Sequence, residues 1–83
     1  MNRYYFHTRN GATSMDAVGV ELDTDEQARA EALTVLGEFL RFGPPDLWKA
    51  GVFTIVVERE GGAVTAVLNT TASRETPEDW PWE

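Results

Sequence analysis

The stretch from Asp23 to Phe42, DTDEQARAEALTVLGEFLRF, is the only segment of the chain long enough for a substantial helix. Asp23 and Thr24 are both suitable N-caps, and each has an acid or an amide three residues later, as in a capping box. A glycine and two prolines follow Phe42 and prevent the helix from continuing. The sequence therefore predicts one central helix over residues 23–42.

Apolar side chains cover roughly half the circumference of this helix, more than a stripe that only covers a sheet requires. One sector contains Ala28, Ala32, Val35, Phe39 and Phe42. The residues that widen it on one side are Arg29, Leu33, Leu36 and Leu40. Two interpretations stay open: the helix only covers a sheet, or its Leu33/Leu40 edge also meets a second copy or another protein. Gly37 lies on the far side, where it is either tolerated or marks a close approach by another backbone.

Two strands are predicted before the helix. Residues 3–9, RYYFHTR, alternate so that Tyr4 and Phe6 face the helix. Residues 10–17 read as a loop, and residues 18–22 form the second strand. One register brings every inward side chain to the same face: Tyr4 with Leu22, Phe6 with Val20, and Thr8 with Val18.

A hairpin is predicted after the helix. Residues 52–60 are the most strand-like run in the chain, and Gly61-Gly62 provides the positive φ angles of a tight type I′ turn. Closing that turn gives the pairs Ile55 with Leu68, Val57 with Ala66, Arg59 with Val64, and Val56 with Val67.

The order β-β-α-β-β predicts an α+β domain over residues 1–71: two layers, a four-stranded antiparallel sheet and one helix on one face. The core is expected to contain Phe6, Val20, Val35, Phe39, Ile55 and Leu68. Trp48, in the connector after the helix, is expected to pack over the end of this core. One helix leaves one sheet face uncovered, and that face would carry Arg3, Tyr5, His7, Arg9, Thr54, Val56, Glu58, Thr65 and Val67.

Residues 72–83, ASRETPEDWPWE, form an acidic C-terminal tail with two prolines. Its composition is typical of a disordered end. Trp80 and Trp82 indicate the alternative, a short segment that docks on this or another protein, because tryptophan side chains are costly to leave in water.

Composition restricts the function. The chain carries 7 basic and 14 acidic residues, a net charge of −7, which argues against general binding to nucleic acid phosphates. It has no cysteine and one histidine, His7, so no His/Cys metal site is expected. The absence of cysteine and of a signal-like start predicts a cytoplasmic protein. No cofactor, catalytic or membrane-spanning motif is expected, and we predict that the chain is not an enzyme.

The expected binding residues are Arg3, Tyr5, His7 and Arg9 on the first strand, Val56 and Val67 on the hairpin, and Trp80 and Trp82 in the tail. Aromatic and cationic side chains on an open sheet resemble RNA-binding surfaces, but the acidic balance favours a protein or peptide partner. A plain solvated face is the remaining alternative.

The blocks RYYFHTRNG, VGVELDT, EQARAEAL and FTIVVEREGGAVTAVL together resemble a bacterial family of short proteins of unknown function that open with R-Y-Y-F-H. The resemblance covers roughly residues 2–70 and departs at Asn10 and in the tail. It implies a small cytoplasmic α+β domain and no specific activity. The strand-strand-helix pattern is also weakly similar to the N-terminal part of HicB-type antitoxins.

These observations predict a non-catalytic interaction domain with an accessory or regulatory role that forms a homodimer. A wide apolar helix face, valines on the outer sheet face and a small core all favour self-association. The contact is expected to use the open sheet face, and the Leu33/Leu40 edge is the alternative. The alternative is a nucleic-acid-linked regulator of antitoxin type.

Overall fold

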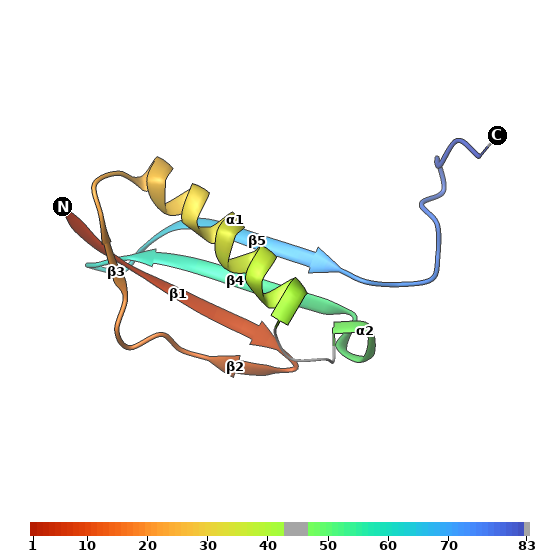
Figure 1. Ribbon diagram of the computed structural model, residues 1–83, viewed down its shortest axis with the longest axis horizontal. Coiled ribbons are helices and arrows are strands. Elements are labelled where there is room, and N and C mark those ends of the chain that lie inside the picture. Colours follow the sequence, from red (N-terminus) through yellow and green to blue (C-terminus); the bar gives the residue numbers. More distant parts are fainter. Residues whose placement is uncertain (43–46, 83) are drawn as a thin grey trace.

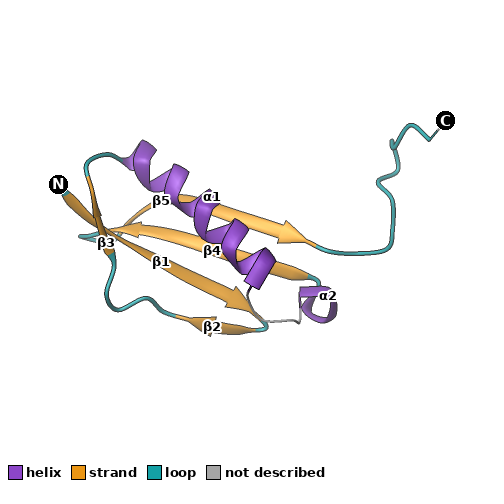
Figure 2. Ribbon diagram, viewed as in Figure 1, coloured by secondary structure: helices purple, strands orange, loops and turns teal. Residues whose placement is uncertain are grey.

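The structure is a computed structural model that describes residues 1–42 and 47–82. Figure 1 follows the chain in order, and Figure 2 separates helices from strands. The elements are β1 (Asn2–Asn10), β2 (Ala12–Ser14), β3 (Val20–Leu22), α1 (Asp25–Phe42), α2 (Leu47–Ala50), β4 (Val52–Arg59) and β5 (Ala63–Thr71).

The strands form one antiparallel sheet in the order β2-β1-β4-β5, with β3 also paired to β1. Helix α1 lies across one face of this sheet (Figure 1). The predicted two-layer α+β fold is therefore confirmed. The sheet has five strands rather than four, because Ala12–Ser14, predicted as part of a loop, pairs with the end of β1.

Thr24 is the N-cap of α1. Its hydroxyl oxygen accepts a hydrogen bond from the Gln27 N–H at 3.1 Å, and its carbonyl accepts the first helical bond, from Ala28, at 3.1 Å. The Gln27 side chain accepts the Asp23 N–H at 2.9 Å, so two donors at the helix start are satisfied reciprocally. Asp23 thus lies outside the helix, which begins at Asp25.

The core lies between α1 and the central strands. Its buried members are Tyr4, Ala28, Ala32, Phe53, Ile55 and Val57. Phe6, Val35, Phe39 and Leu68, all expected in the core, are partly buried and pack against it. The Phe39 and Phe53 rings are 4.8 Å apart. Complete burial of a side chain such as Ile55 stabilises the fold by about 1.5–3 kcal/mol.

The predictions for Val20 and Trp48 are wrong, and Phe42, in the apolar sector of the helix, is also exposed. Val20 is 40% exposed, because β3 is only three residues long and lies beside the N-terminal end of β1. Phe42 is 75% exposed at the last turn of α1. Trp48 is 71% exposed, because Leu47, its neighbour in α2, provides the contact with the core instead.

The predicted register of the first strand pair is also wrong, by two residues. Leu22 pairs with Asn2 rather than Tyr4, and Val20 pairs with Tyr4 rather than Phe6. The physical reason is Asp16, whose carboxylate accepts the Phe6 N–H at 3.1 Å and so occupies the place of a strand partner beside the middle of β1.

The second hairpin follows its prediction except near the turn. The Ile55–Leu68, Val56–Val67 and Val57–Ala66 pairs are confirmed, and both turn glycines have positive φ angles, 101° and 102°. A β-bulge between Val57 and Glu58 shifts the remaining pairs, so Val64 lies opposite Glu58 rather than Arg59.

Within residues 1–42 and 47–82, no helix is both long and apolar enough to cross a membrane.

Candidate functional site

The face of the sheet opposite α1 is the candidate site, and we call it the open face. In the described parts of the chain, no helix lies on it (Figure 1). Residues directly opposite each other on neighbouring strands project from the same face, so the open face extends from β1 across β4 to β5. Its members are Arg3, Tyr5, His7, Arg9, Thr54, Val56, Glu58, Val64, Val67 and Asn69.

His7 is held from two sides. Its Nδ1 accepts the Asp16 N–H at 3.0 Å, and its Nε2 lies 2.8 Å from Glu58 Oε1. Because Nδ1 accepts, the ring proton of the neutral imidazole is on Nε2, which donates to the Glu58 carboxylate. The Tyr5 ring stacks parallel to the His7 ring, with centroids 6.3 Å apart. His7 therefore connects β1 to β4 and to the loop that follows β2.

Asp16 fixes the loop between β2 and β3. Besides Phe6, its carboxylate accepts the Val18 and Gly19 N–H groups at 2.9 and 3.1 Å. Partial burial acts to raise the pKa of this carboxyl, but the three backbone hydrogen bonds outweigh it and hold the pKa below its ordinary value. The loop approaches β1 so closely that only glycine fits at position 19. There φ is +76°, and a Cβ would lie 2.9 Å from the Arg3 side chain.

The two arginines of β1 differ in their environments. Arg3 forms an ion pair with Glu21 at 2.8 Å and donates to the Val18 carbonyl at 2.9 Å. Arg9 is exposed, and its Nε donates to the Thr13 hydroxyl at 3.0 Å. Glu21 therefore neutralises Arg3, whereas Arg9 has no carboxylate partner among the described residues and is the cation available to a ligand.

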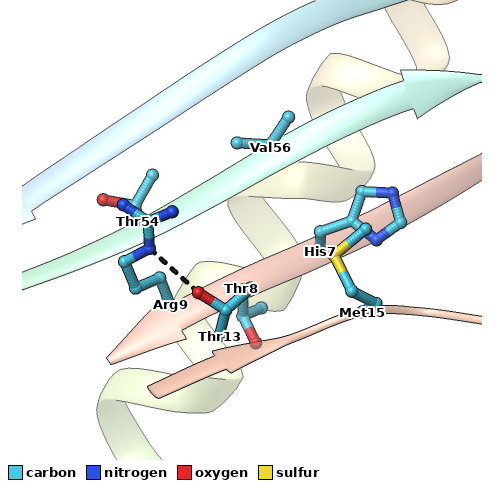
Figure 3. A pocket seen from close by; sticks show the side chains of 7 residues that line it. All are labelled: His7, Thr8, Arg9, Thr13, Met15, Thr54 and Val56. Atoms are coloured by element: carbon cyan, nitrogen blue, oxygen red, sulfur yellow. Dashed lines mark hydrogen bonds between the residues drawn. The ribbon is translucent and has the colours of Figure 1, made fainter. Parts of the chain in front are cut away.

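A pocket of about 220 Å³ opens on this face at the C-terminal half of β1. Figure 3 shows that most of the side chains lining the pocket belong to the strands, and that α1 lies behind the sheet. The Arg9 guanidinium, the Met15 thioether and the Val56 side chain give it one cationic and two apolar contact groups. Its lining residues are His7, Thr8, Arg9, Thr13, Met15, Thr54 and Val56.

The tail leaves the end of β5 and runs away from the sheet (Figure 1). Trp80 and Trp82 are 53% and 74% exposed, and their rings meet edge to face at 6.0 Å. A Trp80 N–H to Pro77 carbonyl bond at 3.0 Å gives the segment a local turn. The structure therefore brings together six of the expected binding residues, Arg3, Tyr5, His7, Arg9, Val56 and Val67, and leaves the two tryptophans apart from them.

Met15, Thr13 and Asp16 were not identified from the sequence, since residues 10–17 read as a loop. The D-x-x-G spacing of Asp16 and Gly19 was the available signal, because aspartate accepts backbone N–H groups two and three residues later in such turns. Within the described ranges, no group of three or more histidine, aspartate or glutamate side chains is placed to hold a metal ion.

Comparison with known proteins identifies one family. Residues 3–71 match the domain of unknown function DUF6894, which covers both hairpins and the helix and excludes the tail. No curated protein and no solved structure matches the chain significantly. Because the match covers well over half of the sequence, the chain belongs to the DUF6894 family.

Proposed function

We propose that this chain is a non-catalytic, homodimeric interaction domain whose open face binds acidic, tryptophan-containing peptide segments. The proposed occupant is the tail of a second copy of the same chain. The observation that carries the proposal is the pocket beside Arg9, which lies on the sheet face that α1 does not cover.

The pocket and the tail have complementary chemistry. A guanidinium attracts the face of an indole ring, and a thioether makes favourable contacts with aromatic edges. Arg9 and Met15 supply these groups, and Val56 supplies an apolar wall. The volume is adequate, since a cavity of about 150 Å³ already accommodates benzene. Glu78 and Asp79 precede Trp80, which places negative charge beside the cation.

The tail is long enough for such docking. Eight residues, from Ala72 to Asp79, lie between the end of β5 and Trp80 and span up to about 26 Å. Neighbouring strands are about 4.8 Å apart, so a tail arriving from beyond the β5 edge crosses about 15 Å to reach β1. In its own subunit the tail points away from the sheet, which favours docking on a second copy (Figure 1).

The proposal is tested with the full chain carrying Trp80→Ala and Trp82→Ala, so that its own tail cannot compete. A fluorescent peptide of residues 72–83 should bind this protein saturably. Adding Arg9→Gln should weaken the peptide about tenfold, since a cation–π contact and an ion pair at an exposed site together contribute about 1–2 kcal/mol.

Arg41→Gln is the matched control, because Arg41 lies over the Phe42 ring at the end of α1 and away from the open face. It should leave the affinity unchanged, and a peptide with both tryptophans replaced by alanine should not bind. Binding that is non-saturable, or equally weakened by both arginine substitutions, would contradict the proposed site.

A nucleic-acid-linked role of antitoxin type is the weaker alternative. Glu21 and Glu58 already engage Arg3 and His7, which reduces the positive character of the open face. A salt-dependent mobility shift with RNA or DNA would favour this alternative. The bacterial origin implied by the opening motif and the cytoplasmic location expected from the composition stay predictions.

A further inference from the structure

Strand β5 is an edge of the sheet. It pairs with β4 on one side, and the strand order ends with it. An edge strand presents a row of backbone N–H and C=O groups that another chain can pair with. At nine residues, Ala63–Thr71 is a long edge.

The hydrogen-bond pattern identifies which groups point outward. The Ala72 N–H donates to the Gly51 carbonyl at 3.1 Å, so these two residues form a hydrogen-bonded pair. Such pairs alternate along an antiparallel ladder, and the register is regular from Val52 opposite Thr71 to Val57 opposite Ala66. Val67, Asn69 and Thr71 therefore turn their backbone N–H and C=O groups away from β4, and no described residue donates to or accepts from them.

The opposite side of the sheet shows how this protein protects an edge. Beside β1, the strands β2 and β3 have three residues each, and Asp16 closes the gap between them. Short strands and interruptions of this kind prevent pairing with other chains.

Only the first part of β5 is protected in this way. The β-bulge lies there, and Arg29 Nε donates to the Thr65 carbonyl at 3.2 Å. From Ala66 to Thr71 the strand has no charge, proline, glycine or bulge. This segment therefore lacks the features by which natural proteins block pairing at an exposed sheet edge.

We propose that two copies of the chain pair their β5 edges antiparallel about a two-fold axis at Asn69. The outward groups are self-complementary in this register. Asn69 lies opposite its own counterpart, and Val67 lies opposite Thr71 of the second copy, which gives about six backbone hydrogen bonds. The result is one continuous sheet across the dimer, with a symmetric interface.

The lack of charge on this strand makes it a suitable contact between two copies of the chain. Two chains of net charge −7 repel each other, so a contact between them requires a neutral surface. Residues 61–73 are the longest run without a charged side chain. The Leu33/Leu40 edge of α1 extends this uncharged surface. Arg29, one turn before Leu33, donates to β5, so this side of the helix lies toward that strand. Leu33 and Leu40 are 60% and 51% exposed, and edge pairing turns the two helices' leucines toward each other.

This inference rests on the homodimer in the proposed function and specifies its contact. The chain has no cysteine, so single-cysteine variants of the full chain report on proximity without background. Under mild oxidation, Asn69→Cys should form a disulfide-linked dimer in most molecules, because paired residues on antiparallel strands have Cα atoms about 5.5 Å apart. Val56→Cys, at the centre of the open face, should stay largely uncross-linked.

A second variant tests the backbone hydrogen bonds. Asn69→Pro removes one outward N–H and leaves the backbone bonds between β4 and β5 intact, although the exposed bond from the Thr54 hydroxyl to the Asn69 side chain is lost. It should convert a dimer of twice 9.3 kDa into a folded monomer in light scattering. Efficient cross-linking of Val56→Cys but not of Asn69→Cys would overturn edge pairing while keeping the homodimer. A monomeric wild-type chain at high micromolar concentration would overturn both. If Asn69→Pro fails to fold, the two cysteine variants still decide.

Discussion

The Tyr4 hydroxyl donates to Asp25 Oδ1 at 2.6 Å and so ties the first turn of α1 to β1. Arg59 of β4 reaches the same carboxylate, with Nη1 3.1 Å from Oδ2. Three elements that are distant in sequence therefore meet at Asp25. Tyr4 is completely buried and needs a partner for its hydroxyl, and the helix start supplies one.

Tyr4→Phe should lower the thermal midpoint while leaving the fold intact, because it removes the hydroxyl and keeps the ring in the core. The measurement is thermal unfolding followed by circular dichroism. Tyr5→Phe, on the open face, is the matched control and should unfold close to the wild-type temperature. Equal midpoints for wild type and Tyr4→Phe would show that the hydrogen bond contributes nothing.

The free energy of unfolding should decrease at acidic pH, the acid limb, and again at alkaline pH, the alkaline limb. The hydrogen bond from Tyr4 and the positive charge of Arg59 together outweigh the effect of burial and lower the pKa of the Asp25 carboxyl. Hydrogen bonds from backbone N–H groups lower the pKa of the Asp16 carboxyl. The unfolded chain then binds these protons more readily, so the stabilisation is present above about pH 4 and is lost as pH falls through the lowered values. The pKa of Tyr4 is raised by its bond to Asp25 and by burial. Its contribution is therefore present below pH 10 and lost as pH rises beyond it.

Urea unfolding at a series of pH values measures both limbs. Asp25→Asn should flatten part of the acid limb, because position 25 then no longer titrates. Glu38→Gln, an exposed carboxylate on α1, is the control and should keep the wild-type slope. An acid limb that is unchanged in Asp25→Asn would contradict the assignment.

Side-chain alternation was sufficient to predict the faces of the sheet, even where the strand register was wrong. The first pair is shifted by two residues, and an even shift keeps every side chain on its original face. Tyr4 and Phe6 therefore face the helix as expected, and Arg3, Tyr5, His7 and Arg9 face away. The register itself depended on Asp16 and Gly19, a contact between a loop and a strand that periodicity does not report.

Strand order could not be predicted from local pattern. Each hairpin is readable in the sequence, but the pairing of β1 with β4 joins residues about fifty positions apart, and this pairing leaves β5 at the edge. The pocket has the same origin, because Arg9 and Met15 lie in the first hairpin and Val56 in the second. Charge and aromatic content indicated the open face, whereas the cavity required the tertiary arrangement.

Gly19→Ala should destabilise the domain by about 1–3 kcal/mol, since alanine is strained at positive φ and its Cβ would contact β1. Gly37→Ala is a control of opposite sign. Position 37 lies in the helix with open space around it, so the close approach considered for Gly37 is absent among the described residues. Alanine there should stabilise α1 by about 0.5–1 kcal/mol. Chemical unfolding of both variants tests the pair, and equal effects would contradict the described loop geometry.

Phe39→Ala should cost about 3 kcal/mol, the lower end of the range for core phenylalanines, because Phe39 is partly buried against the Phe53 ring. Phe42→Ala is the matched control, since that ring is 75% exposed and its loss should change stability by no more than about 0.5 kcal/mol. The free energies of unfolding in urea measure both. A loss under about 1 kcal/mol in Phe39→Ala would mean that the helix face is wrongly assigned.

Tryptophan fluorescence should distinguish how the tail docks. Trp80 and Trp82 are exposed in the single chain, so docking on a second copy should shift their emission to the blue only as the protein concentration rises. Trp48→Phe removes the background of the third tryptophan, which is itself exposed. In this variant, resistance to iodide or acrylamide quenching should increase with concentration, and adding Arg9→Gln should shift that increase to about tenfold higher concentration. A blue shift that is independent of concentration would place the tail on its own subunit. Quenching like that of free indole at every concentration would show that the tail stays undocked.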